Sequence, residues 1–163
     1  MNDIQIILDN IRSAHNVGSI FRTSDGAGVS KIYLVGSTPT PVDRFGRVQA
    51  EIKKTSLGAS ESVAFEHIGE ASSKSSAAAV KLIVRLKAEG YTIVAVEQVK
   101  NSILLPDFVV PDKVVYIFGA EVDGVGPELI ATADCVVEIP MAGIKESLNV
   151  SVTAGIVLFH KHK

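Results

Sequence analysis

Short runs of apolar, strand-forming residues recur along this chain, and segments with a helical pattern separate several of them. The apolar runs cover residues 4–8, 31–36, 62–66, 91–97, 114–119 and 135–140. The helical patterns cover residues 16–26, 73–89 and 147–161. Continuous apolar runs are typical of strands that are buried on both faces of a parallel sheet. The sequence therefore predicts an α/β fold, with helices covering both faces of a parallel sheet.

The length of the chain supports one domain. Its 163 residues, of which 47% are hydrophobic, can bury a single core, and no repeat or linker divides them. Polar or charged residues interrupt each apolar run before it reaches the roughly 20 residues that a membrane span requires. The first ten residues carry Asp where a secretory signal has Lys or Arg. We therefore expect one domain, residues 1–163, that stays in the cytoplasm and does not enter a membrane.

Positive charge is concentrated in the first third of the chain. Residues 1–60 hold seven Lys and Arg against five Asp and Glu, whereas the remainder holds nine against thirteen. Several of these basic residues stand at loop-like or helix-end positions, where they could reach phosphates. They are Arg12, Arg22, Arg44, Arg47, Lys53 and Lys54. An ordinary solvated surface has a similar composition, so charge alone leaves both interpretations open.

Two common kinds of site are not indicated by the sequence. It contains no GxxxxGK[ST] motif, and the glycine-rich residues 119–126, GAEVDGVG, lack the GxGxxG spacing of dinucleotide-binding loops. The four histidines have no metal-ligand spacing apart from His160 and His162 in the basic tail. We therefore expect neither a nucleotide-phosphate loop nor a metal site.

The stretch NIRSAHNVGSIFRTSDGAGV, residues 10–29, follows the first apolar run. If Asn16 caps a helix, Arg22 lies nearly two turns into it. Gly18, one turn earlier, would leave space for the backbone of a ligand. This pattern predicts a guanidinium beside an opening, although a solvated Arg with ordinary capping is the simpler alternative for the motif alone.

The stretch VVYIFGAEVDGVGPEL, residues 114–129, places a carboxylate just beyond a buried strand. The strand is expected to end at Gly119, Glu121 follows two residues later, and Gly124 keeps the loop compact. Ligands of open α/β sheets bind at the carboxyl ends of the strands. We therefore expect Glu121 to face a ligand site.

The stretch IPMAGIKESLNVSVTAGIVLF, residues 139–159, sets a polar cluster between two apolar segments. Ser147 is a suitable N-cap for the helix that follows. Asn149 would lie in a helix that is apolar nearly all round, and a buried amide needs hydrogen-bond partners. We expect Asn149 to orient another polar side chain or a substrate hydroxyl.

In this order, the three stretches resemble the SpoU (TrmH) family of SPOUT-class RNA methyltransferases, and the resemblance runs from about Ile6 to Phe159. The matching residues of the three motifs are Asn10, Arg12, Asn16, Gly18, Arg22 and Thr23; Gly119, Glu121 and Gly124; and Ile139, Pro140, Met141, Ser147, Leu148 and Asn149. Ala120 stands where the family usually has Asn. The resemblance implies a parallel α/β domain whose C-terminal part forms a deep trefoil knot.

The resemblance also implies transfer of a methyl group from S-adenosylmethionine to a ribose 2′-hydroxyl of tRNA or rRNA, by a homodimer without a metal. The residues implied for cofactor binding are Gly119, Ala120, Glu121, Gly124, Ile139, Met141, Ser147 and Leu148. Those implied for catalysis are Asn16, Arg22, Glu121, Ser147 and Asn149. Because a guanidinium stays protonated, we expect Arg22, supplied by the partner subunit, to stabilise the developing alkoxide.

Two alternatives come from other functional classes. The chain could be a non-catalytic RNA-binding or assembly protein that retains the SPOUT fold. It could also be a small-metabolite enzyme on an α/β sheet, which would agree with its net charge of −2. Binding to bulk tRNA and rRNA separates the second alternative from the RNA-directed functions.

Overall fold

A seven-stranded sheet forms the centre of the computed structural model, which describes residues 2–69 and 75–160. Every strand pair is parallel, and the strand order is β3-β2-β1-β6-β4-β7-β5. The strands are β1 (Asp3–Asp9), β2 (Val29–Val35), β3 (Phe65–Ile68), β4 (Thr92–Val96), β5 (Ile103–Leu104), β6 (Lys113–Gly119) and β7 (Cys135–Glu138). The prediction of a parallel α/β sheet is confirmed.

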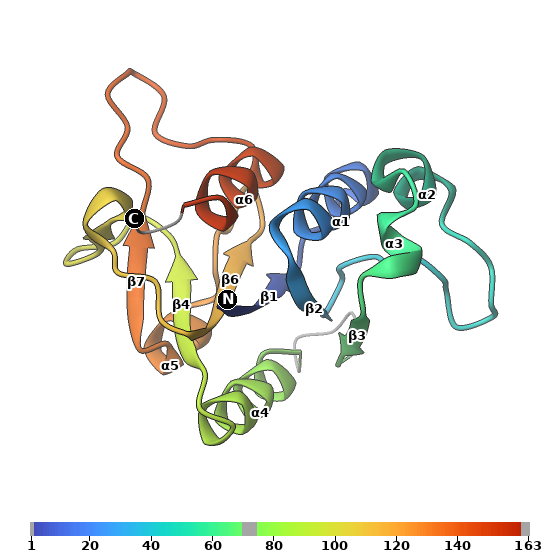
Figure 1. Ribbon diagram of the computed structural model, residues 1–163, viewed down its shortest axis with the longest axis horizontal. Coiled ribbons are helices and arrows are strands. Elements are labelled where there is room, and N and C mark those ends of the chain that lie inside the picture. Colours follow the sequence, from blue (N-terminus) through green and yellow to red (C-terminus); the bar gives the residue numbers. More distant parts are fainter. Residues whose placement is uncertain (1, 70–74, 161–163) are drawn as a thin grey trace.

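Helices cover both faces of the sheet (Figure 1). They are α1 (Ala14–Ala27), α2 (Ala50–Ser56), α3 (Ala59–Ser62), α4 (Ser75–Ala88), α5 (Pro127–Thr132), α6 (Val150–Leu158) and the 3-10 helix η1 (Leu105–Asp107). One core cluster joins Ile6 and Leu8 of β1 to α1 and α6. The second cluster joins Ile7 of the same strand to α4 and α5. Successive residues of β1 thus face opposite layers, which explains why Ile6, Ile7 and Leu8 are all apolar.

The ends of several elements differ from those that the sequence predicts. β3 begins at Phe65, because Ala59–Ser62 forms a helix where a strand was expected to start. The two-residue strand β5 was not predicted. In α4 the buried side is formed by Ala79, Leu82, Ile83 and Leu86, whereas Val84, expected on that side, is 58% exposed. The expected first residues of this helix, 73 and 74, lie outside the described residues.

Both helix caps at the site differ from the prediction. The N-cap of α1 is Ser13, whose hydroxyl accepts a hydrogen bond from the backbone N–H of Asn16. The N-cap of α6 is Asn149, and Ser147 lies outside the helix. Each stretch contains more than one residue suited to capping, so local sequence preference alone does not select between them. α6 also ends at Leu158, earlier than the expected end at residue 161, which itself lies outside the described residues.

Gly18 has a packing role that the sequence interpretation missed. A Cβ at this position would overlap the Thr55 hydroxyl and lie 2.8 Å from the carbonyl oxygen of Ile52, both on α2. The space beside Gly18 is therefore filled by α2, and the prediction that it receives a ligand is wrong. Close approach of the two helices holds α2 and the segment before it against α1.

No helix in the described part of the chain is both long and apolar enough to cross a membrane. Within the same residues, His, Cys, Asp and Glu side chains form no cluster of three or more that could hold a metal ion.

Candidate active site

A pocket of about 390 Å³ lies at the carboxyl ends of β4, β6 and β7, which are neighbours in the sheet. Its lining comes from residues 96–98, residues 118–124 and the segment that leads from β7 into α6. It includes all eight residues predicted to bind a cofactor, namely Gly119, Ala120, Glu121, Gly124, Ile139, Met141, Ser147 and Leu148. Residues far apart in the sequence are thus brought to one edge of the sheet.

A tight turn after β6 forms one wall of this pocket. Ala120 and Gly124 exchange two backbone hydrogen bonds of 3.2 and 2.8 Å, and Gly124 has a positive φ of 66°. A Cβ at Gly119 would overlap the backbone of Gly124 and Val125, and one at Gly124 would overlap the Glu97 carboxylate. Gly119 is therefore required by space, because a Cβ there would meet backbone, and Gly124 is favoured by its positive φ.

Carboxylates at the ends of two strands hold this turn in place, and the sequence interpretation did not identify either of them. Glu97, which follows β4, accepts a hydrogen bond of 3.0 Å from the backbone N–H of Val125. Asp9, the last residue of β1, accepts one of 2.9 Å from Gly126. Burial raises the pKa of Asp9, although hydrogen bonds from Gly126 and Asn10 favour its ionised form. The sequence signal for both carboxylates was an acidic residue at the end of an apolar run, which could have predicted an acid at the carboxyl end of each strand.

A chain of hydrogen bonds joins the three sequence motifs. The Asn16 side-chain N–H donates to the carboxylate of Glu121, and its Oδ1 accepts from Nδ2 of Asn149 at 3.2 Å. The Oδ1 atom of Asn149 in turn accepts from the backbone N–H of Ser151 at 2.8 Å, which caps α6. A carboxylate only accepts hydrogen bonds, so this network fixes the orientation of both amides. Hydrogen bonds are thus donated from Asn149 to Asn16 and from Asn16 to Glu121.

Two expectations about the third motif need correction. Asn149 is exposed rather than buried, because it precedes α6 instead of lying within it. Its amide nevertheless orients a polar partner, since it donates to the buried Asn16. Ser147 does not cap the helix; it lies in the exposed loop that lines the pocket, and it makes no hydrogen bond within the described residues.

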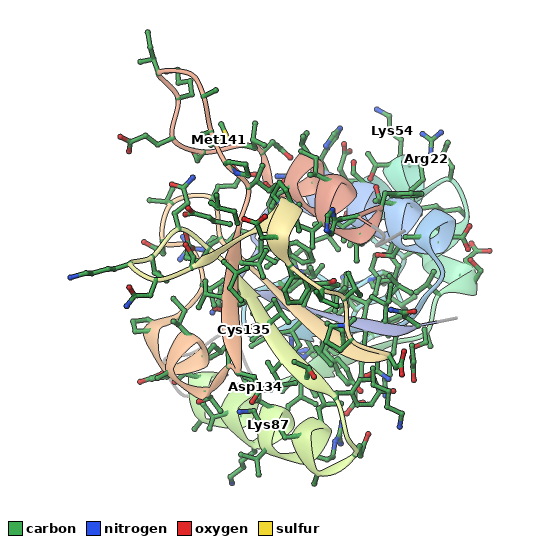
Figure 2. All side chains as sticks on the ribbon, turned by 60° about the vertical axis from the view of Figure 1, so that its left-hand side comes forward. Arg22, Lys54, Lys87, Asp134, Cys135 and Met141 are labelled. Carbon is green, nitrogen blue, oxygen red and sulfur yellow. The ribbon has the colours of Figure 1, made fainter. Side chains whose placement is uncertain are left out.

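Arg22 lies away from this pocket. It is exposed on α1 and does not line the pocket, and its side chain forms no hydrogen bond or ion pair among the described residues. Figure 2 shows Arg22 and Lys54 toward one side of the molecule, and Met141 of the pocket loop toward the other. Asn16, Glu121 and Asn149 are therefore brought together within one chain, whereas Arg22 is not brought to them.

The predicted phosphate-binding residues are all exposed, and they lie on one part of the molecule. Arg12 precedes α1, Arg22 lies on it, and Lys53 and Lys54 lie on α2, which packs against α1. Arg44 and Arg47 lie in residues 42–48, in the segment between β2 and α2. We call the surface formed by α1, α2 and residues 42–48 the basic face.

The pocket has the opposite charge. Five carboxylate residues line it, namely Glu97, Glu121, Asp123, Glu138 and Glu146. None of the described residues that line it is Lys, Arg or His. Such a lining attracts a cationic ligand and disfavours an anionic one such as a nucleotide phosphate.

The chain matches a known protein family over nearly its whole length. The model described as the SpoU rRNA Methylase family matches residues 3–159. The chain is similar to a tRNA (guanosine(18)-2′-O)-methyltransferase of Aquifex aeolicus, with 29% identity over 99% of this chain and 69% of that protein. It is also similar to the 23S rRNA (guanosine-2′-O-)-methyltransferase RlmB of Neisseria meningitidis, with 31% identity over 94% of this chain and 55% of that protein.

The fold has close counterparts among solved structures. The AdoMet-bound rRNA methyltransferase of Sinorhizobium meliloti superposes with a TM-score of 0.79 and 27% identity, covering 97% of this chain and 55% of that one. The chain thus spans little more than half the length of that protein and of the Neisseria relative.

Proposed function

This chain is a member of the SpoU rRNA methylase family, and on that premise we propose that it transfers a methyl group from S-adenosylmethionine to a ribose 2′-hydroxyl of tRNA or rRNA. The observation that carries the proposal is the hydrogen-bond chain from Asn149 through Asn16 to Glu121, at the edge of a pocket built by the second and third motifs. The names of the relatives support the same reaction and the same two substrate classes.

The pocket suits the methyl donor in size and charge. Its volume of about 390 Å³ falls within the range of small-molecule sites. S-Adenosylmethionine carries a sulfonium, an ammonium and a carboxylate group, so its net charge is positive, and five carboxylate residues line the pocket. The residues that would hold it are the turn at Gly119 to Gly124, Ile139 and Met141 after β7, and the loop residues Ser147 and Leu148. When bound, it would supply an electrophilic methyl group, which passes from the sulfonium to the ribose oxygen and leaves a neutral thioether.

The protein's own residues would position the ribose and stabilise charge on it. Methyl transfer is an in-line displacement, so the 2′-oxygen must be oriented and must lose its proton. Glu121, fixed by Asn16, lines the pocket and would orient the hydroxyl. Arg22 would stabilise the developing alkoxide, because a guanidinium donates hydrogen bonds but does not accept the proton at neutral pH. A neighbouring phosphate of the RNA would assist departure of the proton.

A homodimer would bring Arg22 to the site. Arg22 is remote from the pocket of its own chain, and α6, which packs against α1, exposes the apolar side chains of Val152, Ile156 and Phe159. A second copy that covers this face would bury it and present the partner's α1 to the pocket. Sedimentation at micromolar concentration should give a dimer, and Ile156→Glu should give monomers without methyl transfer.

We also include the trefoil knot in this proposal. The chain passes from β6, in the middle of the sheet, through α5 to β7 and then through the pocket loop to α6, which packs against α1. Threading of this last segment would lock the turn after β6 against residues 139–149. It would account for a cofactor site that is made mainly of loops.

Incubation of the purified protein with radiolabelled S-adenosylmethionine and total RNA from a strain that lacks it tests the activity, with the labelled nucleoside then identified. We expect one 2′-O-methylated nucleoside in tRNA or rRNA. Donor and RNA binding without methyl transfer would instead support the RNA-binding or assembly alternative. Absence of RNA binding would support a small-metabolite enzyme.

A further inference from the structure

Residues 42–48 form a small ordered hairpin on the basic face. Val42 and Val48 pair as an antiparallel bridge. Within the turn, Oδ1 of Asp43 accepts from the backbone N–H groups of Phe45 and Arg47 at 2.8 and 2.9 Å, and its Oδ2 accepts from Nε of Arg47 at 2.8 Å. These hydrogen bonds, with that from the Arg47 backbone foremost, lower the pKa of Asp43. The tip of the hairpin is therefore shaped by its own contacts.

An aromatic ring at this tip lies close to two cations. Phe45 is 67% exposed, and the guanidinium carbons of Arg44 and Arg47 lie 4.8 and 5.1 Å from its ring centroid. These are cation–π distances, so the three side chains form one exposed cluster that is both aromatic and positively charged. None of the three is needed for the core, because all are exposed.

The hairpin borders a wide depression. It is lined by residues 36–40, by the hairpin itself and by Phe65 and His67 at β3, and its volume of about 1050 Å³ is at the upper limit of small-molecule pockets. Apolar side chains of Val42 and Val48 are exposed beside it. An open depression of this size, edged by two arginines and an aromatic ring, fits a polymer better than a small metabolite.

We propose that Phe45, together with Arg44 and Arg47, stacks against an unpaired base of the RNA substrate, while the neighbouring depression receives the adjoining nucleotides. This inference rests on the proposed RNA substrate and adds a structural class, because aromatic and guanidinium planes stack on bases that are splayed out of a helix. Figure 1 shows residues 36–49 at one end of the molecule and the pocket loop, residues 140–149, at the other. Within one subunit the base would thus be read at a distance from the methyl-donor pocket.

Fluorescence anisotropy with two RNAs tests the proposal, using a stem-loop with an unpaired loop and a fully paired duplex of the same length. For Phe45→Ala we expect the stem-loop affinity to fall by roughly 5- to 100-fold, the effect of losing one stacked base. Affinity for the duplex should be unchanged, and Phe45→Trp should restore stem-loop binding. Val109→Ala, which also truncates an exposed apolar side chain, is the matched control.

The salt dependence of RNA affinity distinguishes the contribution of base stacking from that of charge. Arg44→Ala should reduce the slope of log K against log[salt] by about one, whereas Phe45→Ala should leave the slope unchanged. Calorimetry with S-adenosylmethionine checks that each variant keeps a folded donor pocket. Equal stem-loop affinity for Phe45→Ala and the wild type would overturn this inference and leave the proposed methyl transfer in place. Failure of the wild type to bind either RNA would instead overturn the proposed RNA substrate.

Discussion

The donor pocket and the basic face differ in how they are built. The pocket is acidic and compact, and its turn at Gly119 to Gly124 is held by backbone contacts that leave no space for a Cβ. The basic face is made of long, exposed side chains on α1, α2 and the hairpin of residues 42–48. The difference suits their proposed ligands, since a small cation binds in a pocket lined by carboxylates, whereas RNA requires charge spread over a wide surface.

The largest effect is expected at Arg22, the residue of the basic face that we assign to the reaction itself. Arg22→Ala should lower methyl transfer by about 100- to 1000-fold, the usual result of removing one hydrogen-bond donor to a developing oxyanion. Affinity for S-adenosylmethionine should be unchanged, because Arg22 does not line the pocket. Single-turnover methylation and calorimetry on one preparation measure both quantities.

Lys81→Ala, which removes an exposed cation from α4 on the opposite face of the sheet, is the control for charge. Loss of donor binding in a folded Arg22→Ala dimer would contradict the division of roles between the basic face and the pocket.

The next effect is expected within the pocket. Gly119→Ala would force a Cβ into the backbone of Gly124 and Val125, so the turn must shift, at a cost of about 1 to 3 kcal/mol in stability. We expect donor affinity to fall by at least about tenfold, since the shifted turn forms the pocket wall. Gly143→Ala is the matched control, because that glycine lies in the pocket loop with open space around its Cβ position. Similar donor affinities for the two variants would show that the turn is not part of the binding site.

A smaller effect is expected for the hydrogen-bond chain. Asn149→Asp keeps an oxygen that caps α6 but removes the N–H that donates to Oδ1 of Asn16. We expect methyl transfer to fall by about tenfold while the melting temperature stays within a few degrees of the wild type, since Asp caps helices as well as Asn. Asn149→Ala, which also removes the cap, should lower stability by about 1 kcal/mol. Unchanged turnover in both variants would make Asn149 a capping residue only.

The smallest effect is expected for the salt dependence of donor binding, which should differ between the pocket and the basic face. Raising the salt concentration should lower the affinity for S-adenosylmethionine by only a few-fold, because close charge pairs in a pocket are screened less than exposed ones. The demethylated product, which lacks the sulfonium charge, should respond still less. RNA affinity should fall much more steeply. Titrations of all three ligands over one salt series measure this, and a steep dependence for the donor would contradict an enclosed acidic pocket.

Much of the fold could be predicted because its signals are local. The apolar runs at residues 4–8 and 114–119 are confirmed as β1 and β6, since a strand covered on both faces is apolar at most of its positions. The position of Glu121 in the pocket could also be predicted, because ligands of parallel α/β sheets bind at the carboxyl ends of the strands. The other seven predicted residues that line the pocket came from the resemblance to the family, and Glu97 was missed. The assignment of the predicted residues to a cofactor came from the same resemblance.

What the sequence by itself determined about this protein is six of the seven strands, their parallel arrangement and the three motifs. The tertiary structure decided which side chains meet. Asn16 donates to Glu121 because β6 lies beside β1 in the sheet, and Ser13 is left to cap α1. Gly18 receives α2 rather than a ligand, and Arg22 lies outside its own pocket. Such pairings depend on packing between segments that are distant in the chain. Local propensity contributes little to the free energy of that packing.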